Sequence, residues 1–192
     1  MKKINLFALA TISLITLNSC GEDKKNQSAE EGAMPMQNDT RMESEDASGN
    51  LDDGKETSTP EFKNENLAAV YEDYLDLKSA LVNSEASDAK ASSEELVKSL
   101  EQTEGGESAL EAAKKIAANE DIKEQRTAFS DLSAAVETML AGNLASGEVY
   151  KQYCPMAFDG AGGYWLSSSE EVRNPYYGDM MLKCGRVEDT IK

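Results

Sequence analysis

Two cysteines and three methionines near the end of this 192-residue chain could bind a soft metal ion. They are Cys154, Met156, Met180, Met181 and Cys184, in the segments YKQYCPMAFDG and GDMMLKCG. Thiolate and thioether sulfurs are soft ligands, which favour Cu(I) over hard cations. Met180 and Met181 precede Cys184 by four and three residues, so a helical turn would put their sulfurs on one side. The spacing predicts a Cu(I) site in which the cysteines supply thiolates, and Met156 with Met180 or Met181 supplies thioethers.

A disulfide between Cys154 and Cys184 is an alternative use of the same residues. Two cysteines in an oxidising compartment usually pair. The bridge would close a loop of about thirty residues and stabilise the fold by roughly 3–4 kcal/mol through chain entropy. The methionines would then be ordinary core residues. A third alternative leaves two unpaired buried thiols.

Composition excludes several classes of chemistry. The chain contains no histidine, which rules out Ser-His-Asp and Cys-His catalysis and zinc sites that need imidazole. Glu170, Glu171 and Asp179 lie among serines and Arg173, a pattern typical of a solvated turn rather than of an acid–base pair. We therefore expect no enzyme. The net charge of −17 argues against nucleic acid or an anionic membrane surface as a partner.

Residues 1–20, MKKINLFALATISLITLNSC, have the pattern of an export signal. Lys2 and Lys3 precede an apolar run that is too short to span a membrane. The ending LNSC resembles the cleavage site of a bacterial lipoprotein signal, with Cys20 as the lipidated first residue of the mature chain. We expect a protein anchored by lipid in the bacterial cell envelope, on the periplasmic face or the outer surface.

The rest of the chain divides into a tether and one domain. Residues 21–60 are polar and acidic without apolar periodicity, which predicts a disordered tether. Apolar residues at helical spacing predict four amphipathic helices, from Phe62 to Leu81 and in SSEELVKSLEQ, ESALEAAKKIAAN and DIKEQRTAFSDLSAAVETMLAG. Short connections favour an antiparallel bundle, and no strand pattern competes with the helices. The predicted fold of residues 61–192 is all-α.

From about residue 148 the composition changes to Tyr, Gly, Pro and Met. We expect an irregular cap on the bundle, with Trp165, Tyr164 and Phe158 packed on the helices. Glycines in the segment FDGAGGYW allow the chain to turn sharply.

The quoted segments also resemble a known family. YKQYCPMA, GGYWLS and EVRNPYYGDMMLKCG, behind LAAVYEDYLDLKSALV and DIKEQRTAFSDLSAAV, are similar to a domain of unknown function from bacterial envelopes. In that family the domain occurs alone in lipoproteins or attached to periplasmic adaptor subunits of copper/silver efflux pumps. The resemblance covers about residues 61–192. It implies metal handling or efflux support, with an efflux adaptor or another envelope protein as partner.

The Cys-Pro-Met segment resembles the short heavy-metal-binding module of such adaptors, in which histidine follows the methionine. Here Ala157 stands at that position and Tyr153 precedes Cys154, so only a sulfur version of the site is possible. Two functions from different classes remain open. The first is a lipid-anchored protein that binds Cu(I). The second is a disulfide-stapled interaction module that docks to an efflux adaptor or another envelope protein through exposed aromatic residues, without metal.

Overall fold

The structure is a computed structural model that describes residues 59–192. The predicted signal peptide at 1–20, the lipidation of Cys20 and almost all of the tether predicted at 21–60 lie outside the described residues. Within 59–192, none of the helices combines the length and the apolar character needed to cross a membrane.

The described chain begins with a short strand, continues with four helices and then forms mainly strands. The elements are β1 (Glu61–Phe62), α1 (Glu65–Val82), α2 (Ala86–Glu101), α3 (Glu107–Ala117), α4 (Ile122–Leu140), β2 (Leu144–Ser146), β3 (Val149–Cys154), α5 (Ala157–Gly160), β4 (Gly163–Ser167), the 3-10 turn η1 (Gly178–Met181) and β5 (Arg186–Ile191).

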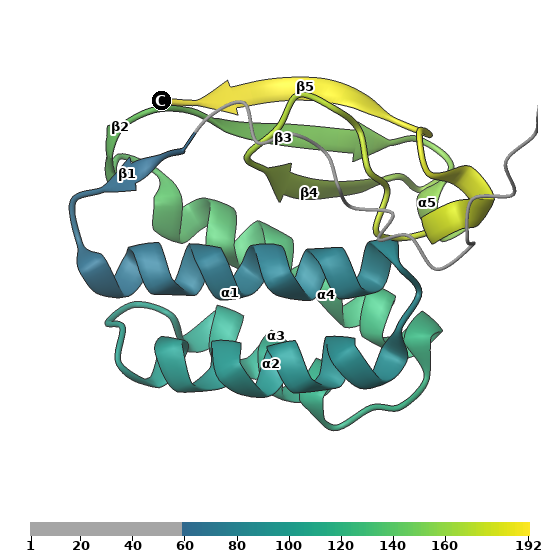
Figure 1. Ribbon diagram of the computed structural model, residues 1–192, viewed down its shortest axis with the longest axis horizontal. Coiled ribbons are helices and arrows are strands. Elements are labelled where there is room, and N and C mark those ends of the chain that lie inside the picture. The colour runs from purple at the N-terminus through teal and green to yellow at the C-terminus, as the bar shows by residue number, and fades with distance from the viewer. Residues whose placement is uncertain (1–58) are drawn as a thin grey trace, which may run out of the picture. The chain divides into compact units, whose positions relative to one another are not determined.

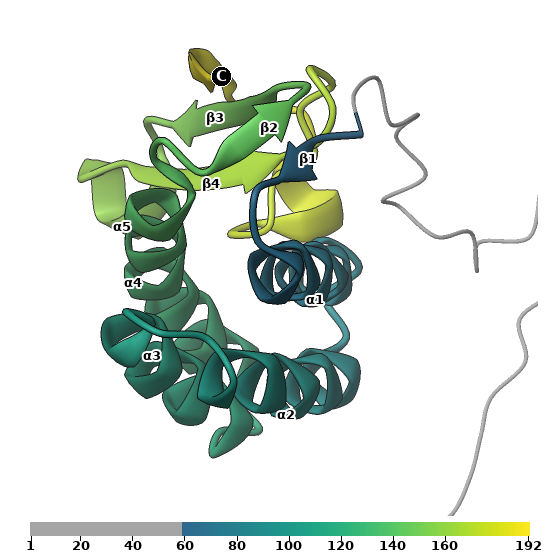
Figure 2. The ribbon, with the colours of Figure 1, turned by 90° about the vertical axis from the view of Figure 1, so that its left-hand side faces the viewer.

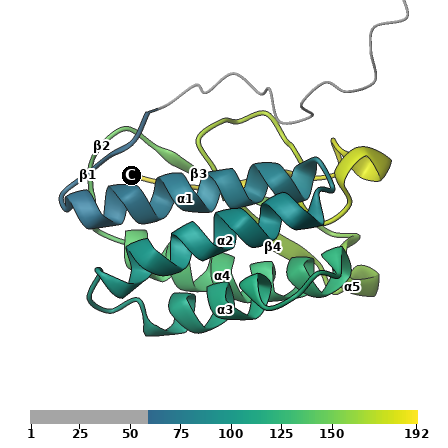
Figure 3. The ribbon, with the colours of Figure 1, turned by 60° about the horizontal axis from the view of Figure 1, so that its bottom comes forward.

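The four predicted helices are confirmed as α1 to α4, but the predicted start of the first at Phe62 is wrong, because Phe62 lies in β1 and α1 begins at Glu65. Local hydrogen bonds set two of their starts. The side chain of Asn64 accepts the backbone N–H of Asn66 at the start of α1, and Asp121 accepts that of Lys123 at the start of α4. Gly142 has a φ of +74° just beyond α4, the conformation expected of a glycine that ends a helix. Helices that follow one another in sequence pack as neighbours, as Figure 3 shows for α1, α2 and α3.

The predicted all-α fold is wrong, because the described chain also contains two antiparallel sheets. β1 pairs with β2, and β3 lies between β4 and β5 in a three-stranded sheet. The predicted irregular cap is therefore largely this second sheet. Its strands lack the apolar–polar alternation by which a strand is recognised in sequence. The inward positions of β3 include the polar Gln152, which is fully buried, and most of β5 is exposed.

The three-stranded sheet covers one side of the α1–α4 pair, and α2 and α3 lie on the other side (Figures 1 and 2). A chain of aromatic contacts crosses from the helices to the sheet. Tyr74 of α1 stacks on Phe129 of α4 at 5.1 Å between ring centroids, and Phe129 contacts Tyr176 at 6.2 Å. Tyr176 meets Trp165 of β4 edge-on at 5.8 Å. Helices and sheet thus share one apolar core.

The predicted inward packing is confirmed for Trp165 and Phe158 but is wrong for Tyr164. Trp165 is fully buried and Phe158 is half-buried against the core, as expected. Tyr164 lies on the outer face of the sheet, where 42% of its surface is exposed and its ring packs on Tyr153. Adjacent residues of a strand point to opposite faces, so Tyr164 and Trp165 could not both pack inward.

The buried hydroxyl of Tyr74 connects three elements. It lies 2.8 Å from the Ser133 hydroxyl of α4 and accepts the backbone N–H of Leu166 of β4 at 3.0 Å. Ser133 in turn donates to the carbonyl of Phe129. Burial raises the pKa of Tyr74 well above its ordinary value, so the phenol stays protonated.

We expect Tyr74→Phe to lower the free energy of unfolding by about 1–3 kcal/mol, because it leaves the buried N–H of Leu166 without a partner. Urea unfolding followed by circular dichroism measures the loss. Tyr164→Phe is the matched control, because its side chain is exposed and should change stability by less than about 0.5 kcal/mol. Equal effects of the two variants would contradict a structural role for the Tyr74 hydroxyl.

Candidate functional site

Strand register brings Cys154 and Cys184 together. Cys154 ends β3, and β5 runs antiparallel to β3 with Tyr153 opposite Arg186. Cys184 lies just before β5, so it reaches the same end of the sheet as Cys154. The two sulfur atoms are 3.0 Å apart. The requirement shared by the metal and the disulfide predictions, that the thiols meet, is therefore fulfilled.

The two thiols differ in their access to solvent. Cys154 is fully buried, whereas Cys184 is half-buried. Both are free thiols, and no disulfide is present among the described residues. A reagent or an ion would therefore reach the pair from the side of Cys184.

The backbone of Cys184 is fixed on both sides. Its N–H donates to the carbonyl of Met181 at 2.9 Å, and its own carbonyl accepts the side-chain amide of Asn174 at 2.7 Å. Asn174 is buried and also accepts the N–H of Tyr176. Gly185 follows with a φ of +150°, and a Cβ there would lie 2.9 Å from the carbonyl oxygen of Tyr153. Only glycine allows β5 to approach β3 so soon after the thiol.

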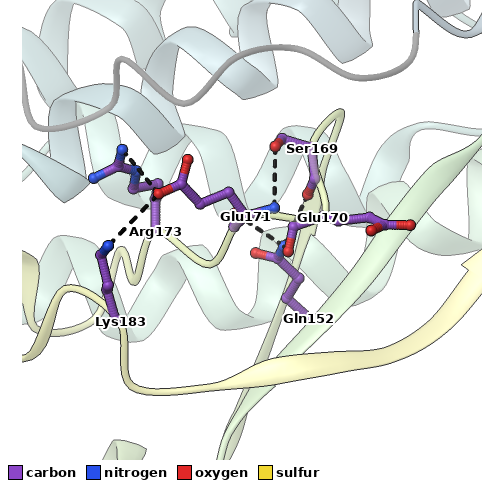
Figure 4. Close-up of polar contacts among 6 residues, drawn as sticks. All are labelled: Gln152, Ser169, Glu170, Glu171, Arg173 and Lys183. Atoms are coloured by element: carbon purple, nitrogen blue, oxygen red, sulfur yellow. Dashed lines mark hydrogen bonds and ion pairs between the residues drawn. The ribbon is translucent and has the colours of Figure 1, made fainter.

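Polar contacts hold the loop between β4 and η1 against the sheet (Figure 4). The buried amide of Gln152 donates to the carbonyl of Ser169 at 2.9 Å. Glu171 forms ion pairs with Arg173 at 3.1 Å and, more loosely, with Lys183 at 3.9 Å. Glu171 is thus a structural partner of the segment that leads to Cys184.

The turn after Cys154 is strained. Phe158 and Asp159, inside α5, both have left-handed backbones, with φ of +53° and +58°. This conformation is unfavourable for residues other than glycine and persists only where the surroundings enforce it. The carbonyl of Met156 accepts the Tyr177 hydroxyl at 2.6 Å, and Gly162 donates to the carbonyl of Ala157 at 2.9 Å. These bonds hold the turn beside the thiols.

The thiols affect one another's protonation. The hydrogen bond with Cys154 raises the pKa of Cys184 above its ordinary value, and burial and the charge of Cys154 act in the same direction. A backbone hydrogen bond from Met156 opposes the shift. The pKa of Tyr177 is also raised, mainly by burial and further by the two cysteines and Asp159. Because its own pKa is raised, Cys184 is a neutral thiol at neutral pH.

The three methionines differ in their exposure to solvent. Met156 is 52% exposed and Met180 is 72% exposed, whereas Met181 is half-buried and accepts the N–H of Cys184 through its carbonyl. Met180 and Met181 end the single 3-10 turn η1 rather than lying on an α-helix with Cys184. The backbone of Met156 thus bonds the thiol of Cys184, whereas that of Met181 bonds only the N–H of Cys184. The thioether roles of all three methionines remain predictions.

Sulfur dominates the possible ligands of this site. In the part of the chain from 59 to 192, no group of three or more His, Cys, Asp or Glu side chains is placed to hold a metal ion. A metal at the thiol pair would therefore take its protein ligands from the two cysteines and neighbouring thioethers. Such a set fits a soft ion with low coordination number.

We expect the reduced thiol pair to form an intramolecular disulfide readily when diamide accepts the two electrons and two protons. Oxidation should raise the free energy of unfolding by about 3–4 kcal/mol, because the bridge closes a loop of about thirty residues. Thiol counting in denaturant and urea unfolding measure both effects. Cys184→Ser is the control and should show neither. Full retention of both thiols after diamide treatment would contradict the observed proximity.

The helical part of the chain matches a known protein family. Residues 70–147 match DUF3347, a family of proteins of unknown function. No curated protein and no solved structure matched the chain.

The DUF3347 match begins within α1, contains α2, α3 and α4, and ends at Gly147, just before β3. The predicted resemblance to a domain of unknown function is thus confirmed for the helices, over a shorter range than the expected 61–192. The match carries no association with lipoproteins or efflux adaptors. Both cysteines of the thiol pair lie beyond the matched segment.

Three structural residues were not among the sequence predictions: Asn174 and Tyr177, which bond the segments around the thiol pair, and Arg126, which bonds the carbonyl of Pro175. Asn174 and Tyr177 lie in the segment EVRNPYYGDMMLKCG, in which nothing indicates that their side chains would bond distant backbone groups. Arg126 lies in the buried stripe of α4, and a charged residue on an apolar helix face was a signal that could have identified it.

Proposed function

We propose that the thiol pair binds Cu(I), with Cys154 and Cys184 as thiolate ligands. The observation that carries the proposal is the distance of 3.0 Å between the two sulfur atoms, from cysteines that are thirty residues apart in sequence. Met156 and either Met180 or Met181 are the proposed thioether ligands. The protein would act in metal handling or efflux support.

The chemistry of the surroundings supports a soft monovalent ion. The chain has no histidine and a net charge of −17, so it offers sulfur ligands within an acidic molecule that attracts cations. The half-buried Cys184 leaves the pair accessible, while the fully buried Cys154 shields it from bulk water on the other side. Desolvated thiols also suit a weakly hydrated ion better than a hard divalent cation.

The same proposal includes the cellular setting. We propose that Cys20 carries lipid, that the protein is anchored in the bacterial cell envelope, and that its partner is an efflux adaptor or another envelope protein. The signal-like residues 1–20 and the resemblance stated above support this setting.

Competition for Cu(I) tests the function. The fully reduced protein should remove one Cu(I) per chain from bathocuproine disulfonate, followed by the loss of absorbance of the coloured chelator complex. Protein oxidised with diamide should remove none, because its sulfurs are then bonded to each other. Absence of competition by the reduced protein would end the metal proposal and leave the disulfide-stapled interaction module.

We expect the apparent Cu(I) affinity to rise with pH between pH 6 and 8. The raised pKa of Cys184 keeps its thiol protonated over this range, so binding must displace that proton. Each displaced proton strengthens binding by about tenfold per pH unit. Chelator competition at several pH values, corrected for titration of the chelator, measures the slope. A flat profile would contradict thiolate coordination by Cys184.

A further inference from the structure

A pocket of about 460 Å³ lies beside the thiol pair and does not include either cysteine in its wall. It is formed where the first turns of α4, the α5 turn and η1 come together. This volume falls within the range of pockets that bind small organic molecules. Its walls combine two cations with aromatic and thioether side chains, in a chain that is otherwise strongly acidic.

The cationic side of the pocket comes from one face of α4. Lys123, Arg126 and Thr127 stand at helical spacing of three and four residues and all line the pocket. Lys123 is exposed, and it forms no ion pair with any residue between 59 and 192. Its ammonium group is therefore available to a ligand.

Arg126 is held in place, with only 9% of its surface exposed. Its Nε donates to the carbonyl of Pro175 at 2.8 Å, and its Nη2 donates to the carbonyl of Leu81 and the hydroxyl of Ser84, both at 2.9 Å. Burial lowers the pKa of Arg126, and the charge of Asp179 opposes that shift. For Nη1, no hydrogen-bond partner is found in the region 59–192. A guanidinium fixed on one side and unpaired on the other is suited to an anion.

The remaining walls are apolar and shaped by the strained turn. Phe158, whose backbone is left-handed, and Met180 of η1 both line the pocket. The hydroxyl of Tyr177 is already used as a donor to Met156, so this wall offers mainly ring surface. Asp159 also lines the pocket and limits its positive charge, which disfavours multiply charged anions such as phosphate.

We propose that this pocket binds a small organic monoanion with an aromatic or other apolar body. The acid group would meet Arg126 and Lys123, and the apolar body would lie against Phe158 and Met180. The pocket shares Met180 with the possible thioether ligands, but neither Cys154 nor Cys184 lines it, and the proposed anion binding does not depend on Cu(I).

Two dyes with the same rings and different charge provide the test. The probe is 1-anilinonaphthalene-8-sulfonate, and the comparison dye is N-phenyl-1-naphthylamine, which lacks the sulfonate. The full chain would carry Cys20→Ala, so that no acyl chain competes for the dye. We expect a saturable fluorescence increase with one bound sulfonate dye per chain, and weaker binding of the neutral dye.

Three single substitutions test whether the sulfonate dye binds in this pocket. Lys123→Gln should weaken binding of the sulfonate about tenfold, as expected for the loss of one charged hydrogen bond, and should not affect the neutral dye. Thr127→Trp, at an exposed position of α4, should fill the pocket and abolish binding of the sulfonate while the thermal midpoint is retained. The matched control is Lys115→Gln on α3, also exposed and outside the pocket, which should leave binding unchanged.

Three outcomes would overturn the proposal. They are absence of saturable binding, equal binding of the two dyes, and equal loss of affinity in Lys123→Gln and Lys115→Gln. The double variant Cys154→Ser with Cys184→Ser should bind the sulfonate dye normally. Failure of the Cu(I) proposal would leave this result intact, so the two proposals are tested separately.

Discussion

Replacing both Cys154 and Cys184 with serine should lower the apparent Cu(I) affinity of the protein by at least about 100-fold. Changes to groups that merely orient metal ligands typically cost 10- to 100-fold, so loss of the ligands themselves should cost more. The structure places the two sulfurs 3.0 Å apart at the end of β3, with no imidazole in the chain to replace them. Chelator competition under strictly reducing conditions measures the effect.

Single methionine variants test which thioethers bind the Cu(I) ion together with the two thiolates. Met156→Leu, Met180→Leu and Met181→Leu each remove a thioether while keeping an apolar side chain of similar size. If thioethers complete the site, Met156→Leu and one of the other two should weaken Cu(I) binding, and the third should not. Met180 is the most exposed of the three and lines the neighbouring pocket. Retention of full affinity by the double serine variant would contradict the thiol-pair site altogether.

Trp165→Ala should destabilise the whole described domain by about 3–5 kcal/mol. Trp165 is fully buried in β4, contacts Tyr176 edge-on, and packs where Gly185 brings β5 close to β3. Replacing a buried tryptophan with alanine removes its transfer free energy and leaves a cavity. Because the sheet and the helices share one core, we expect both to unfold in a single transition at lower urea concentration.

Circular dichroism in the far ultraviolet, which reports mainly the helices, tests whether the sheet is part of their core. Tyr164→Ala is the matched control, one residue away on the exposed face of β4, and should cost only about 0.2–1 kcal/mol through its cross-strand pair with Tyr153. Unfolding of the helices at an unchanged midpoint in Trp165→Ala would show that helices and sheet are independent. That result would contradict the aromatic contacts from Tyr74 to Trp165 described above.

The helices could be predicted because their pattern is local. The apolar residues of α1 and α4 recur every three or four positions, and Asn64, Asp121 and Gly142 mark helix ends through bonds or dihedral angles within one turn. A helix satisfies its backbone hydrogen bonds within its own segment, so a short stretch of sequence carries the information. The match to DUF3347 covers this same helical part.

The strands could not be predicted because their partners are distant in sequence. β3 is bonded on one side to β4 and on the other to β5, and the side-chain N–H of its buried Gln152 donates to the carbonyl of Ser169. A polar residue in the interior removes the alternation that identifies a strand. The amide N–H of Gln152 finds its partner, the carbonyl of Ser169, only after the loop that follows β4 has folded against β3.

The sequence by itself determined the four helices, the absence of imidazole chemistry and the residues that could act as sulfur ligands, since these follow from composition and from spacing within single segments. The tertiary structure alone decided that Cys154 and Cys184 meet, because their contact depends on the register between β3 and β5. It also decided the pocket around Arg126, whose guanidinium is positioned by carbonyls from two other parts of the chain. Contacts of this kind depend on where distant segments lie after folding, which periodicity within one segment does not encode.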